Sequence, residues 1–320
     1  MKESPKAFKL PIFRIGLCSM MFVALIVGTT SLSTTNVSAN HPVFVEGNCD
    51  SPVPGTTIVN LGTCGDFDGD GRIGTAEDTD GADRIFGTLR AALGPGTGAA
   101  AGTGANNNGR ITIVKSGRFA TDVLVIGMPP PGLEGQGTAT PGNVTIEAAP
   151  GVVAIIDAVL QGDPAGGNTA RQAGPAILIN TTPGVVTTLR NLIIRNYADG
   201  IAIANDSRVN IDNCRFENNR DSGVNAFDRS RVVISNSQFQ ANGFRIPVSG
   251  PSTPGAGLLV RNDAQVRIVD SIFAHNFGPG IANNSNSASN VVLYRVASYF
   301  NTPNIQNGVV IAPNPNSSDQ

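Results

Sequence analysis

The segment from Asp66 to Glu77, with the sequence DFDGDGRIGTAE, has the residue types and spacing of a calcium loop. Carboxylates at alternate positions bind a hard cation, a glycine allows the sharp turn between them, and a final glutamate binds the ion with both oxygens. The segment matches the pattern D-x-[DN]-x-[DN]-G-x5-E at every constrained position. Its predicted calcium ligands are Asp66, Asp68, Asp70, the backbone carbonyl of Arg72 and Glu77, with Gly74 acting through a water molecule.

The same segment resembles EF-hand and dockerin-type loops. The dockerin resemblance is closer, because no helical pattern precedes the loop and Cys64-Gly65 leads directly into it. A dockerin normally carries two such loops, and one is visible in this sequence, so the resemblance does not extend to cohesin binding. The alternative interpretation is an Asp-Gly-rich surface turn that binds no metal.

A second group of residues that could do chemistry lies in the second half of the chain. If its carboxylates stack on successive turns and face a groove, they could share a proton or a calcium ion. The alternative is a solvated Asp/Arg ladder. The candidate catalytic residues are Asp206, Asp228, Asp263, Arg208 and Arg231. Asp199 and Asp221, each beside a turn glycine, allow the same two interpretations, and His275 is favoured as a turn residue because no spacing around it implies a catalytic triad.

These residues fall within a repeat of 22 to 23 residues. Three columns of equivalent positions share this spacing, and they agree on one insertion of about eleven residues, Gly243 to Thr253. The first apolar column is Leu189, Ile211, Ile234, Ile268 and Leu293; the second is Ile194, Phe216, Phe239 and Phe273; the glycine column is Gly200, Gly223, Gly257 and Gly280. An asparagine column follows at Asn219, Asn242, Asn276 and Asn301, where we expect left-handed backbone and amides bonded between repeats.

The sequence of each repeat predicts strands and turns and shows no helical periodicity. It also has Asn, Ser, Phe and β-branched residues where a leucine-rich repeat requires leucines, so the repeats are not of that class. The pattern of strand, Asn, glycine turn and next strand, from about Ile111 to Ile311, resembles the right-handed parallel β-helix proteins of the pectate-lyase-like superfold. The resemblance implies an all-β solenoid, for which we count about 7 to 9 coils. Further strands are predicted at 111–114, 122–126, 143–146, 152–156 and 176–179. An amphipathic helix over Asp83–Leu93 is predicted to cap the open N-terminal end.

The start of the chain predicts export. Lys2, Lys6, Lys9 and Arg14 precede an uncharged run of about fourteen residues and a Val37-Ser38-Ala39 cleavage site, as in a secretory signal peptide covering residues 1–39. In an oxidising compartment, Cys49 and Cys64 could form a disulfide within the segment 40–82. Cys214 lies in an apolar strand pattern and is predicted to be a buried free thiol. Residues 83–312 form the cap and solenoid, and 313–320 a disordered tail.

Composition restricts the function. The net charge of −2 carries no basic excess, which argues against nucleic acid as a partner, and no segment after the signal could cross a membrane. Of the lyase and polygalacturonase signatures in relatives of this fold, only an N-x-D at Asn210–Asp212 is present. We therefore expect a secreted or cell-surface calcium-binding β-helix that binds an extracellular polysaccharide. The alternatives are a polysaccharide lyase or glycoside hydrolase, or a structural matrix protein.

The calcium loop makes a direct prediction. Calorimetric titration should show about one tight calcium site, which Asp66→Ala or Glu77→Ala should each remove. Chelation should lower the melting temperature, because an ion that binds only the folded state stabilises it by mass action. An unchanged melting temperature in excess chelator, with no heat of binding, would leave only an acidic turn.

Overall fold

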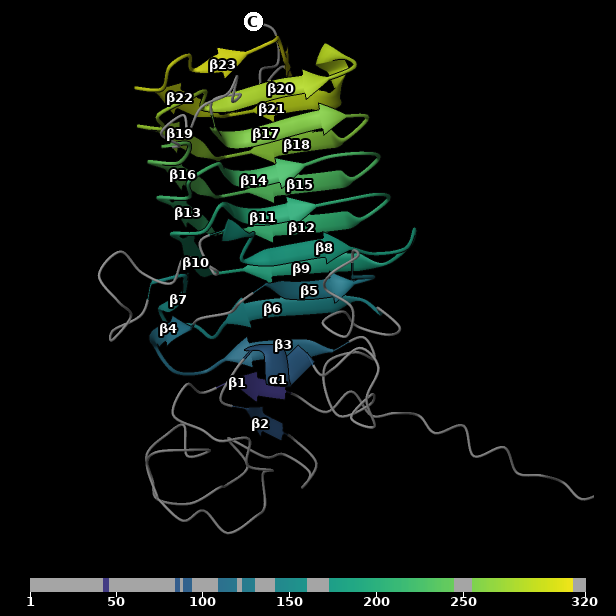
Figure 1. Cartoon of the computed structure of the whole chain (residues 1–320), viewed down its shortest axis with the longest axis vertical. Coiled ribbons are helices and arrows are strands. Elements are labelled where there is room, and N and C mark those ends of the chain that lie inside the picture. The colour runs from purple at the N-terminus through teal and green to yellow at the C-terminus, as the bar shows by residue number, and fades with distance from the viewer. Residues whose placement is uncertain are drawn as a thin grey trace, which may run out of the picture. The chain divides into compact units, whose positions relative to one another are not determined.

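The computed structural model describes residues 43–45, 84–86, 89–93, 109–119, 123–129, 142–159, 173–244 and 255–312. The predicted signal peptide, the calcium loop, the Cys49–Cys64 pair and the C-terminal tail lie outside these residues. Three parallel sheets, here called A, B and C, form the described part of the chain (Figure 1).

The strands pass through the three sheets in rotation. Sheet A contains, in spatial order, β2 (Arg84–Phe86), β1 (Val43–Val45), β3 (Arg110–Ile113), β6 (Val144–Ala148), β9 (Val186–Arg190), β12 (Arg208–Asp212), β15 (Arg231–Ser235), β18 (Gln265–Val269), β21 (Val291–Tyr294) and β24 (Val310–Ile311). Sheet B contains β4 (Gly117–Phe119), β7 (Ala154–Asp157), β10 (Leu192–Arg195), β13 (Arg215–Glu217), β16 (Gln238–Gln240), β19 (Ile272–Ala274) and β22 (Ala297–Tyr299). Sheet C contains β5 (Leu124–Gly127), β8 (Ile177–Asn180), β11 (Asp199–Ile203), β14 (Ser222–Ala226), β17 (Ala256–Asn262), β20 (Ile281–Ser285) and β23 (Ile305–Gln306).

This order is that of a parallel β-helix. From β3 to β23 the described strands make seven coils of one strand per sheet, and β24 begins another. The predicted solenoid and its coil count are confirmed, and the strands predicted upstream of the clear repeat correspond to β3, β5, β6, β7 and β8 within two residues at each end.

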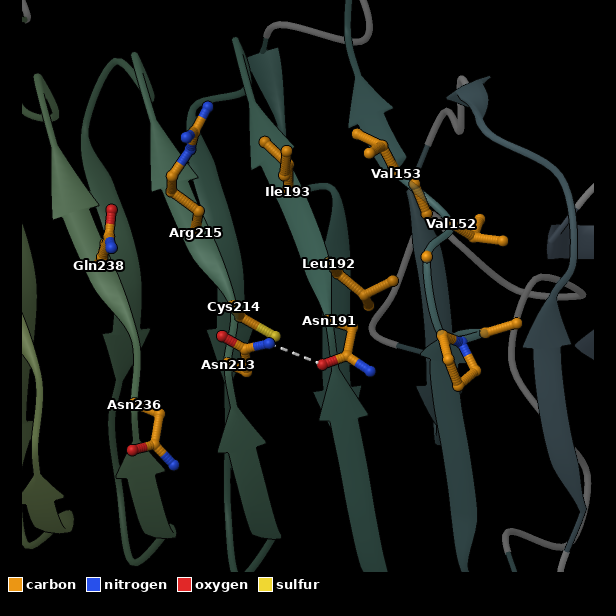
Figure 2. Close-up of a pocket in the computed structure, with 14 residues that line it drawn as sticks. Val152, Val153, Asn191, Leu192, Ile193, Asn213, Cys214, Arg215, Asn236 and Gln238 are labelled. Carbon is orange, nitrogen blue, oxygen red and sulfur yellow. Dashed lines mark hydrogen bonds between the residues drawn. The ribbon is translucent and has the colours of Figure 1, made fainter.

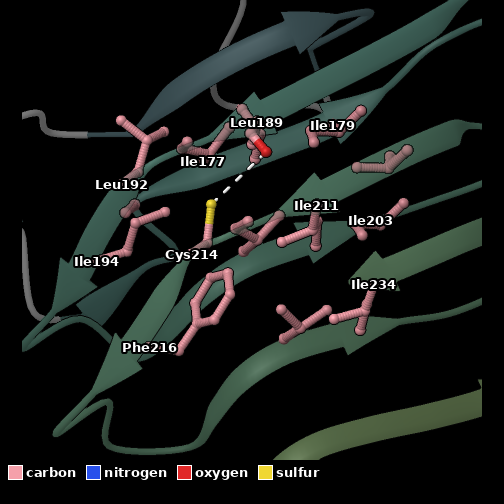
Figure 3. Close-up of a cluster of buried hydrophobic side chains, with 14 of the residues drawn as sticks. Ile177, Ile179, Leu189, Leu192, Ile194, Ile203, Ile211, Cys214, Phe216 and Ile234 are labelled. Carbon is pink, nitrogen blue, oxygen red and sulfur yellow. Dashed lines mark hydrogen bonds between the residues drawn. The ribbon is translucent and has the colours of Figure 1, made fainter. Parts of the chain in front are cut away.

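The two apolar columns form the interior. Leu189, Ile211, Ile234, Ile268 and Leu293 are in register along sheet A. Phe216 stacks on Phe239 at 4.9 Å between ring centroids, and Phe239 stacks on Phe273 at 4.3 Å. Figure 3 shows Phe216 with the aliphatic side chains of neighbouring coils. One coil cannot bury its inner face alone. Burial of each such side chain therefore contributes ~2 kcal/mol to the free energy of unfolding only when coils stack.

The glycine column exists because there is no room for a side chain. A Cβ on Gly223 would lie 2.6 Å from the carbonyl oxygen of Gly257 and 2.9 Å from the ring of Phe239. Gly200 and Gly257 are equally crowded by the carbonyl of the next coil. The Phe stack and the glycine column therefore depend on each other.

The asparagine column forms a buried hydrogen-bonded ladder. The backbone N–H and the Nδ2 of Asn219 both donate to Oδ1 of Asn242, at 3.1 and 3.0 Å, and Asn242 donates in the same way to Asn276. Each Nδ2 also donates to a carbonyl of the coil before it, as from Asn242 to Phe216. Asn219 and Asn242 are fully buried. The ladder thus satisfies polar groups that the turn would otherwise leave unpaired.

One expectation about this ladder was wrong. The ladder residues do not have left-handed backbone; the residue before each of them does, namely Asn218, Ala241, His275 and Phe300, with φ of 52 to 55°. The amide must point inward to reach the next coil, so the chain reverses one residue earlier.

The N-terminal cap also differs from the prediction. Among the described residues of the predicted Asp83–Leu93 helix, Leu89–Leu93 is helical (α1), whereas Arg84–Phe86 forms β2 and pairs with β1. Gly87 interrupts the helical pattern, and pairing at the edge of sheet A outweighs the weak helix propensity of the preceding residues. Leu89, Ala92 and Leu93 are buried in the core, and α1 contacts β1, β2 and β3, so the shortened helix still covers the first coils.

A 3-10 turn, Ala288–Asn290, precedes β21, and Ser287 caps it by accepting from the N–H of Ser289. Among the described residues, no helix is both long enough and apolar enough to span a bilayer.

The ladder predicts a large and local effect on stability. Asn242→Ala should lower the free energy of unfolding by about 3 to 5 kcal/mol, because it leaves several buried donors and acceptors of adjacent coils unpaired. Gln240→Ala, at an exposed position of the same coil, should change it by less than about 1 kcal/mol. Urea unfolding followed by circular dichroism would measure both, and equal effects would contradict a structural role for the ladder.

Candidate functional site

The predicted acids do not form one column. The strands β12, β15 and β18 are in register and begin at Arg208, Arg231 and Gln265. The residue two positions before each of these is Asp206, Arg229 and Asp263, respectively. Asp228 stands three residues before its strand, at the left-handed position that Asn205 and Asn262 hold in the adjacent coils. The three carboxylates therefore do not stack on one another, because Arg229 separates Asp206 from Asp263.

Arg229 is paired with one acid of this group, Asp206. Its Nε and Nη2 donate to the two carboxylate oxygens of Asp206 at 2.9 and 2.8 Å. The hydrogen bond from Arg229 holds the pKa of Asp206 below its usual value. The pKa of Arg229 is raised, first by Asp206 and then by the charges of Asp228 and Asp263. The repeat spacing alone places Arg229 in one column with Asp206 and Asp263, so the pairing of Arg229 with Asp206 could have been predicted from the sequence.

The other acids of the group are tied to asparagines. Asp228 accepts from Nδ2 of Asn262 at 3.1 Å, and Asp263 accepts from Nδ2 of Asn286 at 2.6 Å. Arg208 and Arg231 are exposed neighbours in sheet A. This geometry matches the solvated Asp/Arg ladder, and a catalytic role for the five residues stays a prediction.

A groove of about 430 Å³ lies where sheet A turns into sheet B (Figure 2). The strands β7, β10, β13 and β16 and the turns before them supply its walls. The exposed amides of Asn191, Asn213 and Asn236 recur along it at one per coil, each with left-handed backbone. Asparagine tolerates that conformation better than other non-glycine residues, which explains its repetition at this turn.

The groove amides bond along the solenoid. Nδ2 of Asn213 donates to Oδ1 of Asn191 at 2.9 Å, and Nδ2 of Asn236 donates to Oδ1 of Asp212 at 2.9 Å. Partial burial tends to raise the pKa of Asp212, but hydrogen bonds from Asn236 and Ser235 outweigh this effect and lower the pKa. Each primary amide has two N–H donors and two acceptor lone pairs, so these bonds leave capacity for a ligand.

Charged and apolar side chains complete the groove. Arg215, paired with Glu217, and exposed Gln238 lie on the sheet B side, and Ile193 and Val153 present aliphatic surface. None of the described residues that line the groove is acidic. The arrangement can donate and accept hydrogen bonds and contact C–H groups, which is binding chemistry rather than acid-base chemistry.

Cys214 also borders the groove, but its side chain belongs to the core. The thiol donates to the carbonyl of Leu189 at 3.6 Å (Figure 3), and burial raises the pKa of Cys214 to about 12. The prediction of a buried free thiol is confirmed. A thiol with this pKa is not a nucleophile at neutral pH.

A separate pair of carboxylates lies at the start of sheet C strands. Asp199 begins β11, and Asp221 immediately precedes β14. Burial raises the pKa of Asp199 to about 6; a hydrogen bond from Nδ2 of Asn225, at 3.1 Å, opposes the rise, and the charge of Asp221 adds to it. The sequence identified both residues but gave no sign of this burial, which arises only when the coils stack.

The chain belongs to a known fold family. The family model described as "Right handed beta helix region" matches residues 138–318, more than half of the chain. No curated protein matches the sequence. Among solved structures, "Crystal structure of pectate lyase Pel9A" is 14% identical, with 88% of this chain and 82% of that chain covered and a TM-score of 0.38. At that similarity the pectate lyase defines no site in this protein.

The carboxyl of Asp199 predicts a specific pH dependence. Its folded pKa, about 6, lies above the ordinary value of 3.8, so between these pH values the folded state binds more protons than the unfolded state. The free energy of unfolding should therefore fall as the pH rises from about 4 to 6. Asp199→Asn should remove this fall and stabilise the protein by on the order of 2 kcal/mol at pH 7.

Urea unfolding at intervals between pH 4 and 7 would measure the effect. Asp263→Asn, which changes an exposed carboxylate of the same solenoid, is the matched control. In this variant the free energy of unfolding should depend on pH as it does in the wild type. An unchanged slope in Asp199→Asn would show that another group titrates in this range.

Proposed function

We propose that the protein is an exported polysaccharide-binding β-helix, and that an extended glycan lies in the groove between sheets A and B along the solenoid axis. The observation that carries this proposal is the repetition of Asn191, Asn213 and Asn236 at one amide per coil. Adjacent coils are about 4.8 Å apart, so the groove offers the same donor and acceptor groups at a constant interval. A polysaccharide also presents its hydroxyls at a constant interval of similar scale.

The side chains of the groove suit a sugar chain. Amide groups donate to and accept from hydroxyls, and the guanidinium of Arg215 adds directed donors. Ile193 and Val153, the latter 50% exposed, can contact the C–H faces of sugar rings. Specific ligand sites combine such apolar surface with a few polar groups that fix orientation.

Export and calcium belong to the same proposal. They rest on the signal-like residues 1–39 and on the loop from Asp66 to Glu77, which are sequence observations. A calcium ion bound there would stabilise the segment that precedes the solenoid in the sequence.

A second candidate function, glycoside hydrolysis, is favoured by one observation. Asp199, with a pKa of about 6, is partly protonated near neutral pH, and it lies beside the ionisable Asp221. A protonated carboxyl that donates to the glycosidic oxygen, with a second carboxylate as base or nucleophile, is the pairing that glycosidases use. Because this pair lies outside the groove, we expect binding without turnover on most glycans.

Affinity gel electrophoresis on a panel of neutral and acidic polysaccharides would test the binding proposal. Arg215→Ala and Asn213→Gly should each weaken binding to the retained polymer by about ten-fold, because each removes directed hydrogen bonds. Glycine is chosen at Asn213 because it accepts the left-handed backbone. Arg267→Ala, which removes the same charge from an exposed position in β18, is the matched control.

The same samples should be assayed for reducing ends and unsaturated products. If a polymer is cleaved, Asp199→Asn should abolish cleavage while binding persists, and this result would favour the hydrolase. If no polymer of the panel retards the wild-type protein relative to a gel without polymer, the binding proposal is contradicted.

A further inference from the structure

The last described coils carry a concentration of exposed aromatic side chains. Only 5% of the residues in this chain are aromatic, and the stacked Phe216, Phe239 and Phe273 are buried. Among the residues that the structure describes, the aromatic side chains with large exposed fractions are Phe244 (41%), Phe277 (65%), Tyr299 (42%) and Phe300 (73%). They lie on the side of sheet B that turns toward sheet C, at the opposite edge from the groove. Exposed apolar patches of this kind mark interaction sites.

Two of these side chains, Tyr299 and Phe300, form a contiguous surface with the exposed ring of His275, and this surface is here called the aromatic platform. The rings of His275 and Phe300 stack at 4.9 Å between centroids and 18° between planes. Tyr299 meets both of them edge-on, at 6.3 Å from His275 and 5.4 Å from Phe300. Phe277, two residues after His275, meets Phe244 edge-on at 6.2 Å and continues the aromatic surface along the same turn.

The backbone beneath the platform is held rigidly. The backbone N–H of His275 donates to the carbonyl of Tyr299. The next residue, Asn276, donates from its backbone and side chain to Oδ1 of Asn301, which follows Phe300, at 2.9 and 2.8 Å. The two aromatic turns are therefore linked by the buried asparagine ladder, and the platform is preorganised.

The phenylalanine at the last of these turns, Phe300, does not serve the fold. It occupies the left-handed position, with φ of 55°, at which Asn196, Asn218, Ala241 and His275 stand in earlier coils. A bulky residue such as phenylalanine is an outlier in this region, whereas asparagine and histidine adopt it more readily. The ring of Phe300 is also mostly exposed, so it gains little burial in return. An unfavourable conformation that holds an exposed ring indicates a role in binding.

The chemistry of the platform favours an uncharged ligand of small area. Among the described residues, none of the three rings takes part in an ion pair or a cation–π contact. A whole aromatic side chain offers about 150 to 250 Å². Three partly covered rings therefore offer a few hundred Å², which is less than the ~800 Å² per partner of a stable protein interface.

We propose that the aromatic platform binds a neutral pyranose ring, which stacks its apolar C–H face on Phe300 and His275. This inference rests on the proposed polysaccharide-binding function and specifies the sugar as uncharged and flat-faced. The hydroxyl of Tyr299, which is 42% exposed, can bond to the hydroxyls of such a ring, as amphipathic aromatic side chains do at recognition sites.

The test uses the full mature chain and three soluble probes, the β-1,4-linked hexasaccharides of glucose, xylose and mannose. The chain has no Trp and three Tyr, of which Tyr197 is fully buried and Tyr294 is 8% exposed. All three tyrosines fluoresce, but Tyr299 is the one that a ligand can reach, so a change in fluorescence on binding reports mainly on Tyr299, and calorimetry gives the affinity. We expect at least one hexasaccharide to bind and to change this fluorescence.

Phe300→Asn should weaken that binding at least about five-fold, because it removes the stacking ring. Its melting temperature should not fall, because asparagine suits the left-handed backbone. Tyr299→Ala should abolish the fluorescence response. Met128→Ala, which truncates a 63% exposed apolar side chain far from the platform in sequence, is the matched control and should leave affinity within two-fold.

Three results would overturn the inference. If Phe300→Asn binds the hexasaccharide with wild-type affinity, the platform is not the binding site. The proposed polysaccharide-binding function would still stand if Arg215→Ala shows that the groove binds polymer. Sedimentation showing that Phe300→Asn converts a dimer to a monomer would identify the platform as a self-association surface. Absence of binding to all three hexasaccharides would exclude the neutral pyranose, whereas failure of every polymer on the gels would remove the proposed function as well.

Discussion

Parallel pairing between successive coils is the constraint on which the rest of this structure depends. Each strand bonds to the strand one coil before and one coil after it, so every side chain has equivalents about 4.8 Å away on both sides. A residue type is tolerated inside only if it stacks on copies of itself or on a complementary shape. The Phe stack, the crowded glycine column and the asparagine ladder are three solutions to this one requirement. They are also coupled, since the rings of the Phe stack occupy the space that a side chain on the glycine column would need.

Outward positions are free of this requirement, and the candidate binding surfaces occur there. The groove amides use part of their hydrogen-bonding capacity to link coils and keep the rest for a ligand. The aromatic platform stands on turns whose buried asparagines make its backbone rigid. At the platform the interior ladder positions exposed side chains that are not part of it, and in this way a repetitive fold can carry a specific site.

The repeat made the interior predictable from sequence. The spacing identified both apolar columns, the glycine column and the asparagine ladder, because inward positions recur wherever coils stack. The acids show where this reasoning stopped. Asp228 lies one residue out of step with Asp206 and Asp263, and a shift of one residue moves a side chain to a different place on the turn. Arg229, which pairs with Asp206, interrupts the column because it stands at the position that Asp206 and Asp263 hold in the adjacent coils.

The sequence by itself determined the fold class, the coil count, the identity of the core columns and the buried state of Cys214, since each follows from local pattern and regular spacing. Only the tertiary structure decided which surface groups meet. The raised pKa of Asp199, the groove at the A–B turn and the stacking of His275 on Phe300 depend on side-chain direction and on the offset between coils. The physical reason is that burial and stacking are properties of neighbours more than twenty residues away, whereas periodicity is a property of the chain itself.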